Sequence, residues 1–117
     1  MEIFQNLQQE RRRLLRRLTK EQEIAMGSVS RVNRKCGNPR CHCVQGPAHP
    51  HVLFLYTDKE TEQRRCKLVR RADEKRMLQA GKRYKEFRED MMRLRAIDKK
   101  EKQILMALVE SRSIRYE

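Results

Sequence analysis

Tryptophan is absent from the 117-residue sequence, and phenylalanine and tyrosine occur only three times each. Large aromatic side chains supply much of the buried area of small domains, so a chain with so few can build one small core and little more. Only 38% of the residues are hydrophobic. We therefore expect no deep active-site cleft.

Long apolar runs are missing as well. No stretch approaches the ~20 residues that span a bilayer, and the N-terminal residues lack the apolar region and cleavage site of a signal peptide. These absences predict an intracellular protein with no membrane partner. Its cysteine thiols are then expected to stay reduced.

Acidic residues are in the minority, because 16 Asp and Glu face 29 Lys and Arg and leave a formal net charge of +13. A compact chain with this imbalance repels itself unless a polyanion neutralises it. Nucleic acid is therefore the first partner to consider, ahead of an anionic membrane surface. Nineteen of the basic residues are arginines, whose planar guanidinium group suits phosphate.

The positive charge is concentrated in the middle of the chain. Residues 26–72 hold ten basic and three acidic residues, a net charge of +7, against +2 before and +4 after them. We interpret the charge runs of the long C-terminal segment as a solvated helix face. In the middle segment we predict salt-sensitive contacts to the phosphates of DNA or RNA, with weak sequence preference. The predicted contact residues are Arg31, Arg34, Lys35, Arg40, Arg64, Arg65, Lys67, Arg70 and Arg71.

Residues 2–25 contain neither glycine nor proline, and their apolar residues recur near helical spacing. They predict an amphipathic helix that Gly27 caps at its C-terminal end. The apolar side consists of Phe4, Leu7, Leu14, Leu15, Leu18 and Ala25. Polar Arg11 occupies the helical step in the middle of this side, between Leu7 and Leu14. The opposite side carries Arg12, Arg13, Arg16, Arg17 and Lys20, and we expect Glu10, Glu21 and Glu23 to temper their charge through neighbouring pairs.

The middle of the chain predicts a small antiparallel sheet. Residues 28–34 form a short candidate strand, and residues 51–57 are the most strand-like run of the sequence. A turn at residues 58–60 then leads into a basic second arm, residues 61–69, so that these two runs form a hairpin.

Residues 73–112 contain no proline, and their apolar positions alternate by four and three. This spacing is a heptad seam, which predicts one long helix or two helices joined near Ile97. The seam residues are Met77, Ala80, Tyr84, Phe87, Met91, Leu94, Leu105 and Leu108, and acidic Asp98 and Glu101 interrupt the pattern. The exposed part of the seam needs a partner, which we expect to be the N-terminal helix, a second copy of the chain or another protein.

Three cysteines, Cys36, Cys41 and Cys43, lie within eight residues, and His49 and His51 follow closely. Thiolate and imidazole are the preferred ligands of tetrahedral Zn²⁺. We predict a closed structural zinc site formed by the three cysteines and His49, with His51 and then Cys66 as alternative fourth ligands. His42, between two of these ligands, is expected to point outward.

A catalytic metal site would need a general base, and no acidic residue lies between Glu23 and Asp58. We therefore expect a protein that is not an enzyme. The predicted fold class is α+β, with an N-terminal helix, a zinc-pinned antiparallel sheet of two or three strands and a long C-terminal helix of coiled-coil character. The corresponding segments are residues 1–26, 27–71 and 72–117.

The run Gly27-Ser28-Val29-Ser30, the block Cys36-Gly37-x-Pro39-x-Cys41-x-Cys43 and the following His49 resemble a known family. It comprises small bacterial proteins found near transposases and recombinases, with the signature Gly-Ser-Leu-Ser, Cys-Gly-Lys-Pro-x-Cys-x-Cys and His-Gly-Pro-Tyr. The resemblance covers about residues 27–95 and implies metal positions at Cys36, Cys41, Cys43 and His49. Pro50 and His51 replace the family's Gly-Pro, which keeps His51 as a competing ligand.

The resemblance implies a mobile-element context and a bacterial cytoplasmic location, on the nucleoid or in a ribonucleoprotein, but no activity. We expect a zinc-binding accessory protein that binds nucleic acid and serves a transposase, recombinase or RNA-guided effector. The alternative is a helical adaptor or oligomerisation protein, such as a homodimer, that docks one of these enzymes. Methionines along the long helix suit such an adaptable interface.

Overall fold

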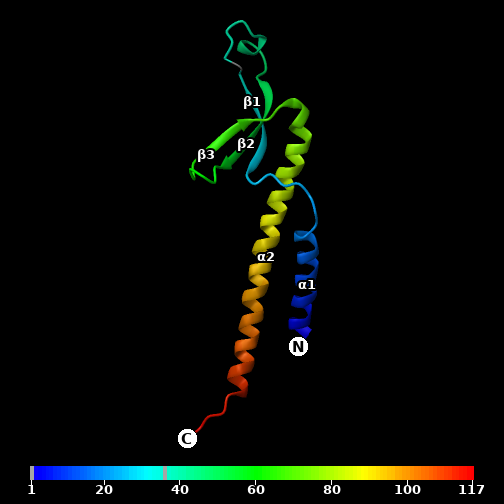
Figure 1. Ribbon diagram of the computed structural model, residues 1–117, viewed down its shortest axis with the longest axis vertical. Helices are drawn as coiled ribbons and strands as arrows, with labels where there is room; N and C mark the ends of the chain where they lie inside the picture. The colour runs from blue at the N-terminus through cyan, green and yellow to red at the C-terminus, as the bar shows by residue number, and fades with distance from the viewer. Residues whose placement is uncertain (1, 36) are drawn as a thin grey trace. The chain divides into compact units, whose positions relative to one another are not determined.

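The computed structural model describes residues 2–35 and 37–117. Helix α1 (Glu2–Leu18) is followed by strands β1 (Ser28–Arg34), β2 (His49–Thr57) and β3 (Arg64–Leu68), and then by helix α2 (Glu74–Arg112) (Figure 1). Single turns of 3-10 helix lie at His42–Val44 and Arg71–Asp73. This order confirms the predicted α+β architecture, with three strands in one antiparallel sheet.

The chain forms two compact units. The helical unit consists of Met1–Glu21 with Glu86–Glu117, and the sheet unit consists of Gln22–Lys85. Helix α2 contributes its first residues to the sheet unit and the remainder to the helical unit. No helix in the described part of the chain is long and apolar enough to cross a membrane.

In the helical unit, α1 packs antiparallel to α2. Leu14 of α1 and Ile97 of α2 are its most buried apolar side chains, with 6% and 0% of their surface exposed. Helix α2 continues without a break through Ile97, so the single-helix prediction is confirmed over the two-helix alternative. Ile97 lies one residue before Asp98, outside the predicted seam positions. A buried apolar side chain is therefore present where the acidic residues interrupt the seam.

The two acidic residues that interrupt the seam are paired with Arg11 of α1. The Nε of Arg11 donates to Glu101 Oε1 at 3.0 Å, and the same guanidinium also binds Asp98. The hydrogen bond to Glu101, followed by that to Asp98, raises the pKa of Arg11. Only 14% of the Glu101 side chain is exposed, against 46% of Asp98. The charged layer is therefore part-buried, and its pairing favours one register of the two helices.

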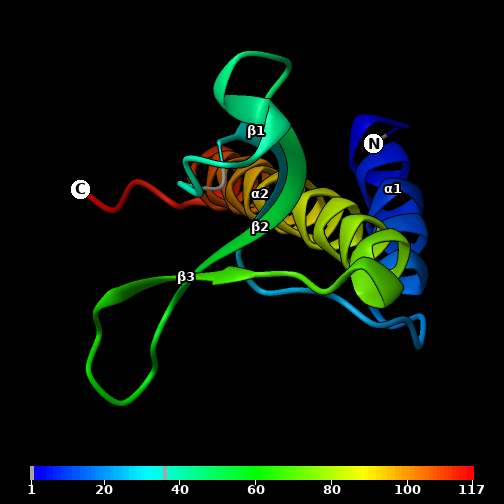
Figure 2. The same cartoon turned by 90° about the horizontal axis from the view of Figure 1, so that it is seen from above.

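In the sheet unit, β2 is the central strand and pairs antiparallel with β1 and β3. Val52 of β2 is 1% exposed, and it lies in the part of the strand next to β1. Figure 2 shows the turn between β2 and β3 extending away from the first turns of α2. Helix α2 approaches β1 closely at Gly81, where an added Cβ would lie 2.8 Å from the Val29 side chain.

Helix α1 ends at Leu18, so the prediction that it continues to residue 25 with Gly27 as its cap is wrong. The Thr19 hydroxyl donates to the Leu15 carbonyl at 2.7 Å, and the Lys20 N–H reaches back three residues to Arg17. Further on, the Ala25 N–H donates to the Ala80 carbonyl of α2 at 3.0 Å. The Ala25 N–H therefore has its partner in α2 and not in a continued α1, and the segment before β1 is not helical.

Strand β2 begins at His49, two residues earlier than predicted, and contains Pro50. Proline lacks a backbone donor and is tolerated in a strand where one side is unpaired. Pro50 lies opposite Asn33 of β1, whereas β3 reaches along β2 only as far as Leu53. The proline therefore costs no hydrogen bond to β3.

We predict that Arg11→Met destabilises the helical unit by about 1–3 kcal/mol, because Asp98 and Glu101 then lose the cation that compensates them. Thermal unfolding followed by circular dichroism measures this loss. Adding Glu101→Gln to Arg11→Met should restore part of it, since the neutral amide needs no counter-charge. Arg12→Met, at an exposed position of the same helix, is the control, and an equal loss in both single variants would contradict the charged-layer role.

Candidate metal centre

Residues 37–48, which we call the knuckle, connect β1 to β2 through two consecutive turns. Asn38 accepts the Cys41 N–H on its carbonyl and the Arg40 N–H on Oδ1, both at 3.0 Å, with Pro39 at the second turn position. Proline and asparagine favour this geometry. Gly37 has a φ of +82°, which glycine adopts without strain.

The second turn positions the thiols. The Val44 N–H donates to the Cys41 carbonyl at 3.2 Å and closes the 3-10 turn His42–Val44. The Cys43 side chain is fully buried inside this turn, and Cys41 immediately precedes it. His49, the first residue of β2, lies opposite Arg34 at the end of β1. The sheet therefore supplies the imidazole and the knuckle supplies the thiols.

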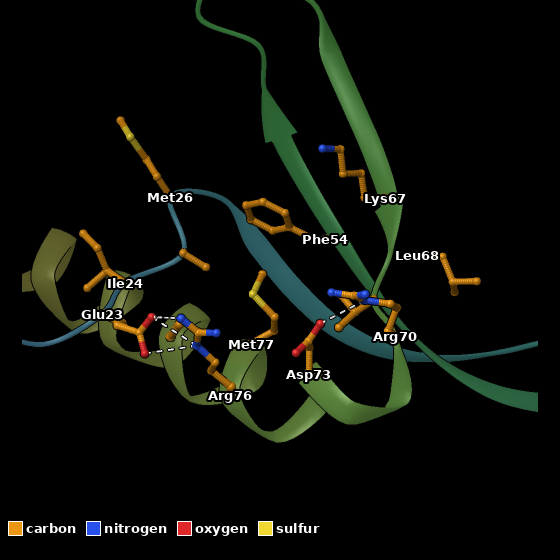
Figure 3. A pocket seen from close by; sticks show the side chains of 13 residues that line it. Glu23, Ile24, Met26, Phe54, Lys67, Leu68, Arg70, Asp73, Arg76 and Met77 are labelled. Carbon is orange, nitrogen blue, oxygen red and sulfur yellow. Dashed lines mark hydrogen bonds and ion pairs between the residues drawn. The ribbon is translucent and has the colours of Figure 1, made fainter.

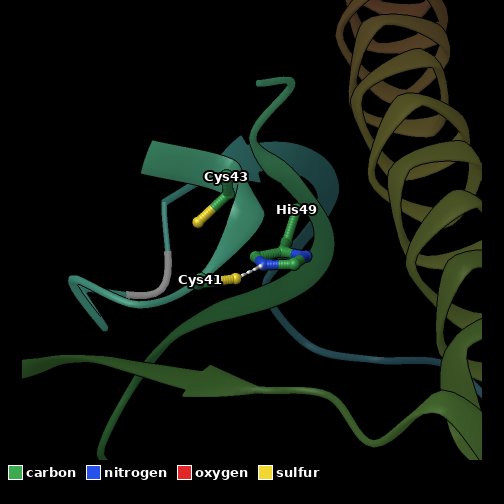
Figure 4. A group of neighbouring side chains, drawn as sticks. All are labelled: Cys41, Cys43 and His49. Atoms are coloured by element: carbon green, nitrogen blue, oxygen red, sulfur yellow. Dashed lines mark hydrogen bonds between the residues drawn. The ribbon is translucent and has the colours of Figure 1, made fainter. Parts of the chain in front are cut away.

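Cys41, Cys43 and His49 form a cluster that could hold a metal ion (Figure 4). One ligand atom from each lies within 4.8 Å of the other two, and Cys41 Sγ is 3.0 Å from His49 Nε2. Zn–S and Zn–N bonds of tetrahedral zinc imply ligand separations of about 3.5–3.8 Å. Small side-chain shifts would bring the three donors to these distances.

The other candidate ligands that the structure describes are not part of this cluster. Cys36 lies outside the described residues. The His51 ring centre is 6.2 Å from that of His49, and Cys66 is exposed on β3, opposite Leu55. His42 is exposed, yet its ring centre is 5.0 Å from that of His49 and its Nδ1 is 3.8 Å from Cys41 Sγ. Its adjacency to Cys41 in the sequence could have indicated the contact with Cys41, but not the position beside His49.

The nine predicted phosphate contacts are all exposed, but they do not form one cluster. Arg34 lies opposite His49 at one end of β2, and Arg64 lies opposite Thr57 at the other end. Lys35 and Arg40 belong with Arg34 at the knuckle end. The remaining residues of β3 and the start of α2 form a separate group.

Several of these cations have partners within the sheet unit. Three form ion pairs: Arg31 with Glu74 at 4.0 Å, Arg65 with Asp58 at 3.1 Å and Arg70 with Asp73 at 3.2 Å. Lys67 lies 5.5 Å from the centre of the Tyr56 ring, and Lys35 donates to the Val44 carbonyl at 3.3 Å. Within residues 2–35 and 37–117, no hydrogen bond or ion pair engages the side chains of Arg34, Arg40, Arg64 and Arg71.

A separate open groove of about 460 Å³ lies in the sheet unit (Figure 3). Phe54, Met77 and Ala80 are among its apolar lining residues. Two ion pairs flank it, Glu23 with Arg76 and Arg70 with Asp73. The hydrogen bond from Arg76 lowers the pKa of Glu23. Both acidic groups of the groove are thus neutralised by arginine, and the groove does not include the metal cluster.

The model of a protein family described as a domain of unknown function, DUF6788, matches residues 4–89. The match includes nearly all of α1, the three strands, the knuckle and the first part of α2. No curated protein and no solved structure matches the chain. Because the family model covers well over half of the sequence, the chain belongs to the DUF6788 family.

Proposed function

We propose that this chain is a non-enzymatic accessory protein that holds one structural zinc ion and binds the phosphate backbone of DNA or RNA. The observation that carries this proposal is the set of exposed arginines around the knuckle and the β2–β3 hairpin that have no acidic partner among the described residues. Such groups are available to phosphate without first breaking an ion pair.

The donor set supports zinc as the metal. Two thiolates and an imidazole are typical of structural zinc, and a fourth ligand closes the tetrahedron. Cys36, five residues before Cys41, supplies that ligand in our proposal and makes a site of three cysteines and one histidine. When bound, the ion would neutralise the converging thiolates and tie the knuckle to the start of β2.

Two of the four free arginines, Arg34 and Arg40, are adjacent to the metal cluster in the sheet unit. Arg40 directly precedes Cys41, and Arg34 lies opposite His49 in the sheet register. A zinc site of three cysteines and one histidine carries a net charge of about −1, which leaves residues 26–72 strongly positive. Zinc would thus fix the backbone that presents the arginines, while the arginines make the contacts.

The mobile-element context has its support in the sequence resemblance, through Gly27-Ser28-Val29-Ser30 and the cysteine block. In that setting, a transposase, recombinase or RNA-guided effector would act on the same nucleic acid. The adaptor alternative has less support, because α1 packs on the seam of α2 over Asp90–Glu101 through Arg11 and Arg17. The seam residues there already have a partner within the chain.

We predict one zinc ion per chain in protein purified without chelators, as measured by atomic emission. Cys41→Ser should abolish this stoichiometric zinc, because a serine hydroxyl is a far weaker ligand than thiolate. Cys66→Ser is the matched control and should retain it, since Cys66 lies on β3 away from the cluster. Purified wild-type protein without any metal, or equal zinc loss in both variants, would contradict the assignment.

We predict salt-dependent binding to labelled duplex DNA or RNA, measured by fluorescence anisotropy. Arg34→Gln/Arg40→Gln should make the slope of log K against log salt less negative by about 0.9 for each phosphate of duplex DNA that the variant no longer binds. Lys75→Gln/Lys82→Gln removes the same charge from exposed positions of α2 in the sheet unit and should change the slope little. Wild-type affinity that does not fall as salt rises would overturn the proposed function.

A further inference from the structure

The outer face of α1 carries three exposed arginines, Arg12, Arg13 and Arg16, which we call the α1 arginine face. At about 100° per residue, they fall within an arc of about 100° on the side of the helix opposite Leu7 and Leu14. Within residues 2–35 and 37–117, none of the three has a hydrogen bond or an ion pair. The face is therefore fully presented to solvent in the helical unit.

Two acidic residues expected to temper this face form their ion pairs elsewhere, which corrects the sequence-based expectation for Glu23. Arg93 of α2 binds Glu10 with two nitrogens, one of them at 2.7 Å, and this interaction lowers the pKa of Glu10. The nearby charge of Arg13 also contributes to lowering the pKa of Glu10. Glu23 is bound by Arg76 in the sheet unit. Glu21 lies beyond the end of α1. Arg11 and Arg17 of α1 have acidic partners on α2, whereas the three arginines of the face have no ion pair with these carboxylates.

These charges also lie close to one another. Arg12 and Arg16 are four residues apart, and Arg13 and Arg16 are three apart. Like charges at these spacings are neighbours on a helix surface and destabilise it. A bound polyanion relieves that repulsion, whereas solvent alone only screens it.

We propose that the α1 arginine face is a second phosphate-binding surface for nucleic acid, in addition to the arginines of the sheet unit. This inference rests on the proposed function. Four residues of helix rise about 6 Å, close to the rise of about 6.8 Å over two successive nucleotides of one strand. Arg12 and Arg16 can therefore address phosphates two nucleotides apart along one strand, and arginine binds each with a bidentate geometry.

The helix geometry favours nucleic acid over a lipid surface. An interfacial helix inserts its apolar side among the acyl chains. In α1 that side is already used, because Leu14 is buried and Leu7 and Leu18 are half-buried in the helical unit. Two phosphate-binding surfaces on one chain also raise the overall affinity, since binding through one holds the other at high local concentration.

The test compares the zinc-loaded wild type with Arg12→Gln/Arg13→Gln/Arg16→Gln across a salt series, using a labelled DNA duplex and single strand and the equivalent RNAs. We expect the variant to make the slope of log K against log salt on duplex DNA less negative by up to about 2.7. Its helical circular dichroism should be unchanged and its thermal midpoint equal or higher. Arg95→Gln/Lys99→Gln/Lys102→Gln removes the same charge from exposed positions of α2 and should shift the slope by less than the amount expected for one phosphate.

A wild-type slope in the α1 variant, together with a reduced slope in Arg34→Gln/Arg40→Gln, would overturn the α1 surface and leave the proposed function standing. Equal slope changes in the α1 and α2 variants would also overturn it, because net charge alone would then explain the effect. Absence of binding by the wild type to all four nucleic acids would overturn the proposed function itself. Loss of binding to phosphatidylserine vesicles with unchanged nucleic-acid binding would show that the face serves lipid instead.

Discussion

The scarcity of buried apolar side chains is the constraint on which the structure depends. Among the described residues, the buried hydrophobic set is Leu14, Ala25, Cys43, Val52, Ala80 and Ile97, which contains no aromatic residue and only one large side chain from each helix. A core of this size contributes little stability by burial alone. Each unit therefore relies on specific contacts. The helical unit has the charged layer of Arg11, Asp98 and Glu101, and the sheet unit has the close approach of α2 to β1 at Gly81 and the cysteine–histidine cluster.

The same scarcity relates the fold to the proposed function. Because few residues are buried, most of the 29 Lys and Arg side chains remain at the surface, and acidic residues can neutralise only some of them. The ion pairs that do form, such as Glu10 with Arg93 and Glu23 with Arg76, hold elements together. The cations left without an ion pair among the described residues include those of the knuckle, the hairpin end and the outer face of α1, together with exposed lysines of α2. The arginines that stabilise the fold are therefore different residues from those that we propose to bind phosphate.

The predictable parts of the structure are those that depend on local periodicity. Heptad spacing was sufficient for α2, and β-branched and aromatic composition was sufficient for β1 and β2. The end of α1 was not predictable, because it depends on the hydrogen bond from Ala25 to Ala80, which joins residues far apart in sequence. The partners of Arg11 and Glu10 depend on helix pairing in the same way. The close spacing of cysteines and histidine indicated the metal cluster, while the position of His42 beside His49 required the folded knuckle.

We propose that a metal ion at Cys41, Cys43 and His49 replaces a hydrophobic core at the knuckle end of the sheet. Amide hydrogen exchange of the zinc-loaded and chelated protein tests it most directly, because each segment reports separately. We expect metal removal to abolish protection along β1 and in β2 from His49 to Val52, while the amides around Leu14 and Ile97 stay protected. Unchanged protection of β1 and β2 after complete metal removal would contradict it.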